Sequence, residues 1–275
     1  MNYGSRKVNR SDLQKILKNQ AVKNIIKPVS NNISEEPMAA KKEHKLKESQ
    51  TIVTESGKTA KEAKPVGDAG KLRTGAIVLW VLAVAMEACG LATLLGKMNL
   101  KFMPTDYQII AYIVLDLLFV IIGSQLWKKA NHIKPASEEN KLKFWLWNNM
   151  GVIVCCFAFI PYIVLLLKDK NMDKKTRTVA LAAAAIALII GGASSVDYNP
   201  VSAEQQAAAI STFGDEIVYW APYGKVYHTH EDCSALNRSD ELTYGTVEQA
   251  IAENRTRLCS FCAKEDSITG VATEE

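Results

Sequence analysis

Three cysteines and two histidines near the C-terminus have residue types and spacings suited to binding a metal ion. Cys259 and Cys262 form a Cys-x-x-Cys pair, which can present two thiolates to one ion from a tight turn. Cys233 lies upstream, and either His228 or His230 precedes it at a workable spacing. Because zinc prefers four tetrahedral sulfur and nitrogen ligands in closed structural sites, the pattern predicts a structural zinc site.

Two other interpretations of these cysteines are weaker. The polar C-terminal segment has three cysteines, which cannot all pair within one chain, so a pure disulfide framework fits poorly. A redox-active Cys-x-x-Cys is disfavoured because no thioredoxin-like βαβ pattern surrounds it. A domain this small has little core, and a bound metal ion is a physical substitute for one.

Two acidic residues lie inside otherwise apolar runs of the sequence. Glu87 is mid-way along the run 74–96, and Asp116 is mid-way along the run 107–127. Neither run contains a lysine or an arginine, and antiparallel runs would place both acids at a similar depth. An ionised carboxylate in a membrane is very costly, so one or both acids should be protonated or bound to a cation. The acids form either a proton or cation site or a hydrogen bond that holds two helices together.

The elements that must position these acids are four apolar runs. They are predicted to be transmembrane helices, and they cover residues 74–96, 107–127, 144–167 and 179–195. The first three are long enough to cross ~30 Å of hydrocarbon at ~1.5 Å per residue, whereas the fourth is shorter and rich in alanine. Trp127, Trp145 and Trp147 lie at one end of the second and third runs, which is the aromatic-belt position. The sequence therefore predicts an all-α transmembrane four-helix bundle.

Polar segments surround the predicted bundle. Residues 1–73 hold 16 Lys+Arg and 8 Asp+Glu, a net charge of +8, and are predicted to be a disordered basic tail. After the bundle, residues 196–212 are predicted to be a linker. Residues 213–265 are predicted to form a small C-terminal α+β zinc-binding module, and residues 266–275 are predicted to be a tail.

Local signals indicate the elements of the predicted module. The β-like runs 217–220 and 225–227 surround Ala221-Pro222-Tyr223-Gly224, which favours a hairpin. Thr246 followed by Gln249 three residues later indicates the capping box of a short helix that ends near Glu253.

The motifs of the module resemble a known family. The relevant segments are Val226-Tyr227-His228-x4-Cys233, Gly245-Thr246-Val247-x-x-Ala250 and Leu258-Cys259-x-x-Cys262. They are similar to the small zinc-binding module related to the metal-binding domain of Ada-type repair proteins. The resemblance implies His228 as the fourth ligand, but it does not imply methyl transfer, because three cysteines stand where the reactive version of that family has four. The full layout resembles uncharacterised bacterial multi-pass membrane proteins that end in this module.

Charge and missing motifs narrow the expected function. From Asp215 to Glu265 the chain has 9 acidic and 5 basic residues, a net charge of −4, which disfavours nucleic acid as a partner. The sequence has no His-Glu-x-x-His, Gly-x-Ser-x-Gly or phosphate-loop motif, so an enzyme is not favoured. The sequence favours a membrane-anchored binding or scaffold protein whose zinc module recognises a protein partner. The alternative is a small ion- or proton-coupled transporter that uses Glu87 and Asp116.

The expected location is the cell membrane, with several crossings of the lipid bilayer and both termini in the cytoplasm. The basic tail lacks an export signal, and an even number of crossings returns the chain to its starting side. The connection 168–177 opposes this orientation, because it carries five positive charges and would face outside.

Overall fold

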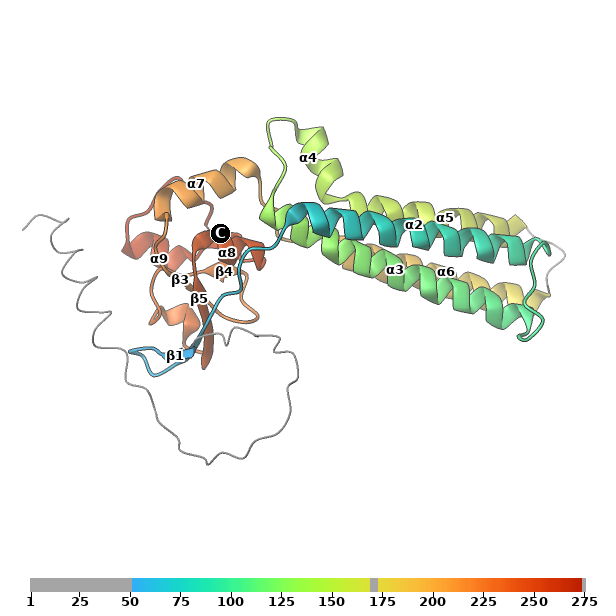
Figure 1. The fold of residues 1–275 in the computed structure, drawn as a ribbon, viewed down its shortest axis with the longest axis horizontal. Coiled ribbons are helices and arrows are strands. Elements are labelled where there is room, and N and C mark those ends of the chain that lie inside the picture. The colour runs from blue at the N-terminus through green and yellow to red at the C-terminus, as the bar shows by residue number, and fades with distance from the viewer. Residues whose placement is uncertain (1–50, 169–172, 274–275) are drawn as a thin grey trace, which may run out of the picture. The chain divides into compact units, whose positions relative to one another are not determined.

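The structure is a computed structural model that describes residues 51–168 and 173–273 of the 275-residue chain. Within these ranges the chain is mostly helical, with two small sheets (Figure 1). The predicted basic tail lies outside the described residues as far as residue 50.

Four of the described helices are long and apolar enough to cross a membrane. They are α2 (Ala69–Leu94), α3 (Thr105–Ile133), α5 (Met150–Lys168) and α6 (Lys174–Ser195). Asp68 caps α2 by accepting from two backbone amides of its first turn, and Asp173 caps α6 in the same way. The fourth predicted run, which starts at residue 179, is therefore the apolar part of a longer helix with a basic first turn.

The third predicted run is not a single helix. Residues Lys141–Asn148 form a separate short helix, α4, and α5 begins only at Met150. The Asn149 side-chain amide donates to the backbone oxygen of Trp145 at 2.9 Å, which satisfies a carbonyl at the end of α4. Trp145 and Trp147 thus belong to α4, and the prediction of one helix over 144–167 is wrong in its first turn.

Small residues let the long helices approach one another closely, and Figure 1 shows these helices side by side. A Cβ atom on Gly123 of α3 would lie 2.7 Å from Nε1 of Trp80 in α2. A Cβ atom on Gly191 of α6 would lie 2.8 Å from the sulfur of Cys155 in α5. Only glycine allows these two contacts, as in tightly packed membrane helices.

A cluster of three tryptophans marks one end of these helices. The ring centroids of Trp80 and Trp127 are 5.2 Å apart, and those of Trp127 and Trp147 are 5.1 Å apart. The guanidinium of Arg73 lies 5.2 Å from the Trp147 ring, within the range of a cation–π interaction. The aromatic residues expected at this end therefore pack on one another, except Trp145, which is exposed.

The C-terminal module, residues 203–273, contains short helices and strands. In chain order they are α7 (Ala203–Phe213), β3 (Val218–Trp220), β4 (Val226–Tyr227), the 3-10 turn η1 (Ser234–Leu236), β5 (Glu241–Gly245), α8 (Val247–Ala252), β6 (Arg257–Leu258) and α9 (Ser260–Glu265). Strands β4 and β6 pair in parallel as one sheet. The largest fully buried side chains of the module core include Trp220, Tyr227, Leu242 and Ile251.

A hairpin from before the long helices completes the other sheet of the module. Strands β1 (Thr51–Val53) and β2 (Thr59–Glu62) are antiparallel, and β2 runs parallel to β5, giving the order β1-β2-β5-β3. Ala60 of β2 faces the core opposite Leu242 of β5 and is fully buried. The predicted tail over residues 1–73 is thus wrong from residue 51 onward, because partners distant in sequence order this segment.

Two further boundaries also differ from the predictions. The predicted linker 196–212 contains α7, whose Ser202 and Gln205 form a capping box and whose Phe213 packs edge-on against Tyr227. Residues 266–273 are not a free tail, because Ile268 and Val271 pack against the module core.

The predicted hairpin over 217–227 is reduced to a single bridge. Tyr219 and His228 exchange two backbone hydrogen bonds of 2.8 and 2.7 Å, whereas β3 and β4 pair mainly with other strands. The predicted capping box of α8 is confirmed, since Thr246 and Gln249 bond reciprocally.

Candidate metal centre

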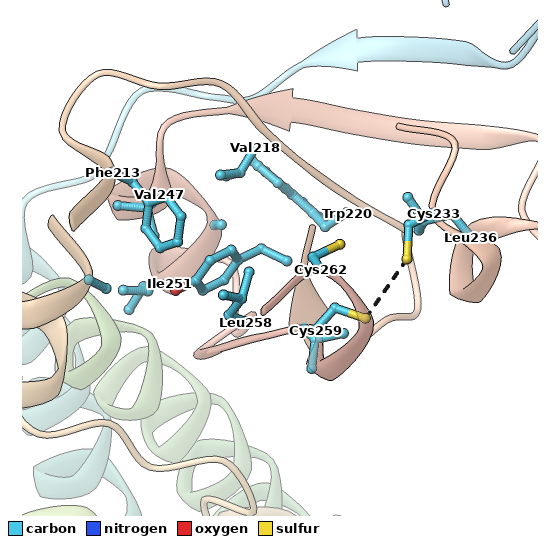
Figure 2. Close-up of a cluster of buried hydrophobic side chains, with 14 of the residues drawn as sticks. Phe213, Val218, Trp220, Cys233, Leu236, Val247, Ile251, Leu258, Cys259 and Cys262 are labelled. Atoms are coloured by element: carbon cyan, nitrogen blue, oxygen red, sulfur yellow. Dashed lines mark hydrogen bonds between the residues drawn. The ribbon is translucent and has the colours of Figure 1, made fainter. Parts of the chain in front are cut away.

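Four donor side chains meet in the core of the C-terminal module. They are His228, Cys233, Cys259 and Cys262, and their ligand atoms all lie within 4.8 Å of one another. All four side chains are buried. Figure 2 shows the three cysteines beside the apolar core, with the sulfur atoms of Cys233 and Cys259 joined by a dashed line.

Parallel pairing of β4 with β6 brings two of the donors together. Tyr227 pairs with Leu258, so His228 and Cys259 are the next residues on adjacent strands. The backbone amide of Cys259 donates to the oxygen of Tyr227 at 2.9 Å, which fixes this register. Cys259 also precedes α9, and Cys262 lies in its first turn, so one tight turn supplies both thiols of the Cys-x-x-Cys motif.

The loop that carries Cys233 is held by the β1–β2 hairpin. Cys233 precedes η1, and its carbonyl accepts from Leu236 N at 2.8 Å. From the hairpin, the Lys58 ammonium donates to the backbone oxygens of Glu231 at 3.3 Å and Leu236 at 3.2 Å. Ser56 N donates to the Glu231 carboxylate at 3.2 Å. Sequence reasoning missed these supporting residues, because no local pattern links residues 56–58 to a loop beyond four helices.

The distances between the donors fit a tetrahedral ion. At a metal–sulfur bond of about 2.3 Å, tetrahedral geometry separates two sulfurs by roughly 3.8 Å. The sulfurs of Cys233 and Cys259 are 3.9 Å apart, and the sulfur of Cys262 is 3.8 Å from His228 Nδ1. Four protein donors at these separations can hold one metal ion.

Burial sets the protonation states of two of the four donors. Burial lowers the pKa of His228 to about 4, and the Lys58 ammonium acts in the same direction, so the imidazole is neutral and can act as a ligand. Burial raises the pKa of the Cys233 thiol to about 12. A bound divalent cation would offset the free-energy cost of deprotonating this buried thiol, because the cation stabilises the thiolate that binds it.

His230, the other histidine considered from the sequence, lies outside the cluster. Its Nε2 atom is 2.7 Å from a carboxylate oxygen of Asp266, and Thr229 donates to the other carboxylate oxygen at 2.6 Å. The hydrogen bond to Asp266 raises the pKa of His230. The structure therefore brings His228, and not His230, to the three cysteines.

The two acids of the long helices lie on facing helices and are both buried. Glu87 is in α2 and Asp116 is in α3, and these two helices pack against each other. Tyr162 of α5 is a further buried polar side chain in these helices, which the sequence alone did not indicate. Neither acid contributes to the metal cluster.

We predict that the two histidines differ sharply in their effect on metal binding. His228→Ala and Cys259→Ser should each lose the ion from the purified full-length protein, because each removes a donor from a closed site. His230→Ala, the matched control, should keep the metal content of the unchanged protein. Elemental analysis of the three variants tests this. Loss of the metal in His230→Ala with retention in His228→Ala would show that the ligand assignment is wrong.

Comparison of the chain with protein-family models, with curated proteins and with solved structures finds no match. The resemblance to the Ada-type metal-binding domain therefore stays an expectation from the motifs.

Proposed function

We propose that this chain is a membrane-anchored binding or scaffold protein, in which a structural zinc module recognises a protein partner. The observation that carries the proposal is the closed cluster of four buried donors in a module attached to four membrane-length helices. Four protein ligands leave no coordination position for a substrate, which is the arrangement of structural rather than catalytic zinc sites.

Zinc is the ion that this donor set favours. Three thiolates and one imidazole are soft to borderline ligands, and tetrahedral sites of this composition are typical of zinc. The cysteines are also three of the buried residues of the module core, so the ion would join the segments that bear them. Binding energy at such a site contributes directly to folding.

The surface of the long helices supports their insertion into a lipid bilayer. Large apolar side chains point outward from all four, among them Ile77, Val81, Leu118, Phe157 and Ile189. A soluble helix bundle would expose polar side chains at such positions, whereas hydrocarbon accommodates apolar ones. We therefore propose a transmembrane four-helix bundle.

The pairing of β2 with β5 supports a topology in which the segments before the first long helix and after the fourth lie on the same side of the membrane. Strand β2 precedes the first long helix and β5 follows the fourth, yet their residues pair directly over Thr59–Glu62 and Glu241–Tyr244. Hydrogen-bonded strands must share a compartment, and four crossings satisfy this requirement. We assign that compartment to the cytoplasm, because it keeps thiols reduced and suits the basic N-terminal segment.

Cysteine labelling tests this topology. Lys101→Cys lies in the connection between α2 and α3, and Thr269→Cys lies in the C-terminal module. An impermeant thiol reagent added to intact cells should label Lys101→Cys and should reach Thr269→Cys only after permeabilisation. Labelling of Thr269→Cys in intact cells would place the module outside and contradict the proposal.

The proposed recognition surface includes Phe261, which lies between the metal donors Cys259 and Cys262 in the sequence. This ring is 58% exposed although its neighbour Cys262 is fully buried. Because α9 begins at the Cys-x-x-Cys turn, a bound ion would fix the direction of this aromatic side chain. Exposed aromatic residues at fixed positions are typical anchors of protein interfaces.

A photo-crosslinking amino acid at position 261 of the full-length protein tests partner recognition in cells. We expect one discrete protein adduct from position 261, and no such adduct from the exposed control position Asp215. Adding Cys259→Ser should abolish the adduct, because the ion no longer orders α9. The absence of an adduct, or the same adducts from both positions, would contradict partner recognition through this surface.

A further inference from the structure

Three polar side chains from three different helices converge inside the membrane-length part of the structure. They are Glu87 of α2, Asp116 of α3 and Tyr162 of α5, with exposed fractions of 9%, 2% and 2%. Helices α2, α3 and α5 all pack against one another. A Cβ atom on Gly90 would lie 2.8 Å from the Tyr162 hydroxyl, so this hydroxyl rests on α2 one turn beyond Glu87.

The hydrogen-bonding capacity of this polar cluster is unused. Oδ1 of Asp116 and the hydroxyl oxygen of Tyr162 are buried without a hydrogen-bond partner. Neither Glu87 nor Asp116 forms a hydrogen bond or an ion pair within the part of the chain that the structure describes. Buried polar atoms are almost always satisfied in proteins, so these two atoms have the capacity for a further hydrogen bond.

The neighbourhood supplies no cation for the two acids. The sequence has no lysine or arginine between Thr74 and Gly96, or between Phe102 and Trp127. The other titratable groups that face the cluster are Tyr112 and Cys155, both neutral in their protonated forms. Helix α6, which packs against α3 and α5, has no charged residue from Thr178 to Val196.

We propose that Glu87, Asp116 and Tyr162 form an exchangeable proton-binding site within the helix bundle. Two carboxylates in apolar surroundings without a counter-cation cannot both stay ionised, so at least one of them binds a proton. On binding, the proton passes from water to one carboxylate oxygen, which becomes the hydroxyl of a carboxylic acid. The Tyr162 hydroxyl, which has no hydrogen-bond partner among the described residues, could then rotate to donate to the remaining carboxylate. On release, the same O–H bond breaks and the proton returns to water.

The cluster lies within two turns of one end of α2 and of α5. Glu87 precedes the end of α2 at Leu94 by seven residues, and Tyr162 precedes the end of α5 at Lys168 by six. At ~1.5 Å per residue these ends are roughly 10 Å away. The site needs no part of the metal centre, so it stands independently of the proposed partner recognition. It is the feature that an ion- or proton-coupled function would require.

An apolar carbodiimide is the probe for this proposal, because such reagents add to protonated carboxyls inside lipid and leave exposed carboxylates largely unmodified. The full-length protein in phospholipid vesicles would be treated over a pH series, digested and mapped by mass spectrometry. We expect the label on Glu87 or Asp116 at neutral pH, with labelling lost at alkaline pH. The exposed Glu139 serves as an internal control and should stay unlabelled.

Two variants separate a proton site from a merely apolar position. Glu87→Gln removes the neighbouring charge, so the pH of half-maximal labelling at Asp116 should fall by about one unit or more. Tyr162→Phe removes one donor without removing a carboxyl, and it should raise that pH. No label on either acid in the unchanged protein, or a labelling profile that neither variant shifts, would overturn the proposal.

Discussion

Four donor side chains join three segments of the C-terminal module, and in the function proposed above the module depends on an ion that they bind. Its ligands come from the end of β4, the turn before η1 and the start of α9, which are all short elements. The module around them is a small domain, and the core of a domain of this size alone rarely supplies enough stability. An ion bound by His228 and the three cysteines would join these segments in the way that disulfides join small secreted domains.

The β1–β2 hairpin links this module to the beginning of the long helices. Ala60 is buried against the module core, and Lys58 bonds the carbonyls of the loop that carries Cys233. Because β2 precedes the four membrane-length helices and β5 follows them, their pairing joins the two segments that flank these helices. In the proposed topology, the β1–β2 hairpin therefore couples the conformation of the metal site to the position of the first long helix.

Local patterns in the sequence predicted the parts of this structure that short-range physics determines. The four apolar runs, the capping box at Thr246 and the Cys-x-x-Cys turn all depend on residues within a few positions of one another. The β2 strand could not be found in this way, because Thr59–Glu62 is polar and is ordered by partners about 180 positions away. Tyr162 was missed for a related reason, since only the packing of α5 on α2 brings its hydroxyl to Gly90, one turn from Glu87.

X-ray absorption at the zinc edge of the purified full-length protein tests the central claim most directly. The account predicts one zinc ion per chain, with three sulfur neighbours at about 2.3 Å and one nitrogen neighbour at about 2.0 Å. The nitrogen should disappear from the spectrum in His228→Ala and remain in His230→Ala. A protein without zinc, or an ion with water or carboxylate oxygen in place of one of the four donors, would contradict the claim of a closed structural site.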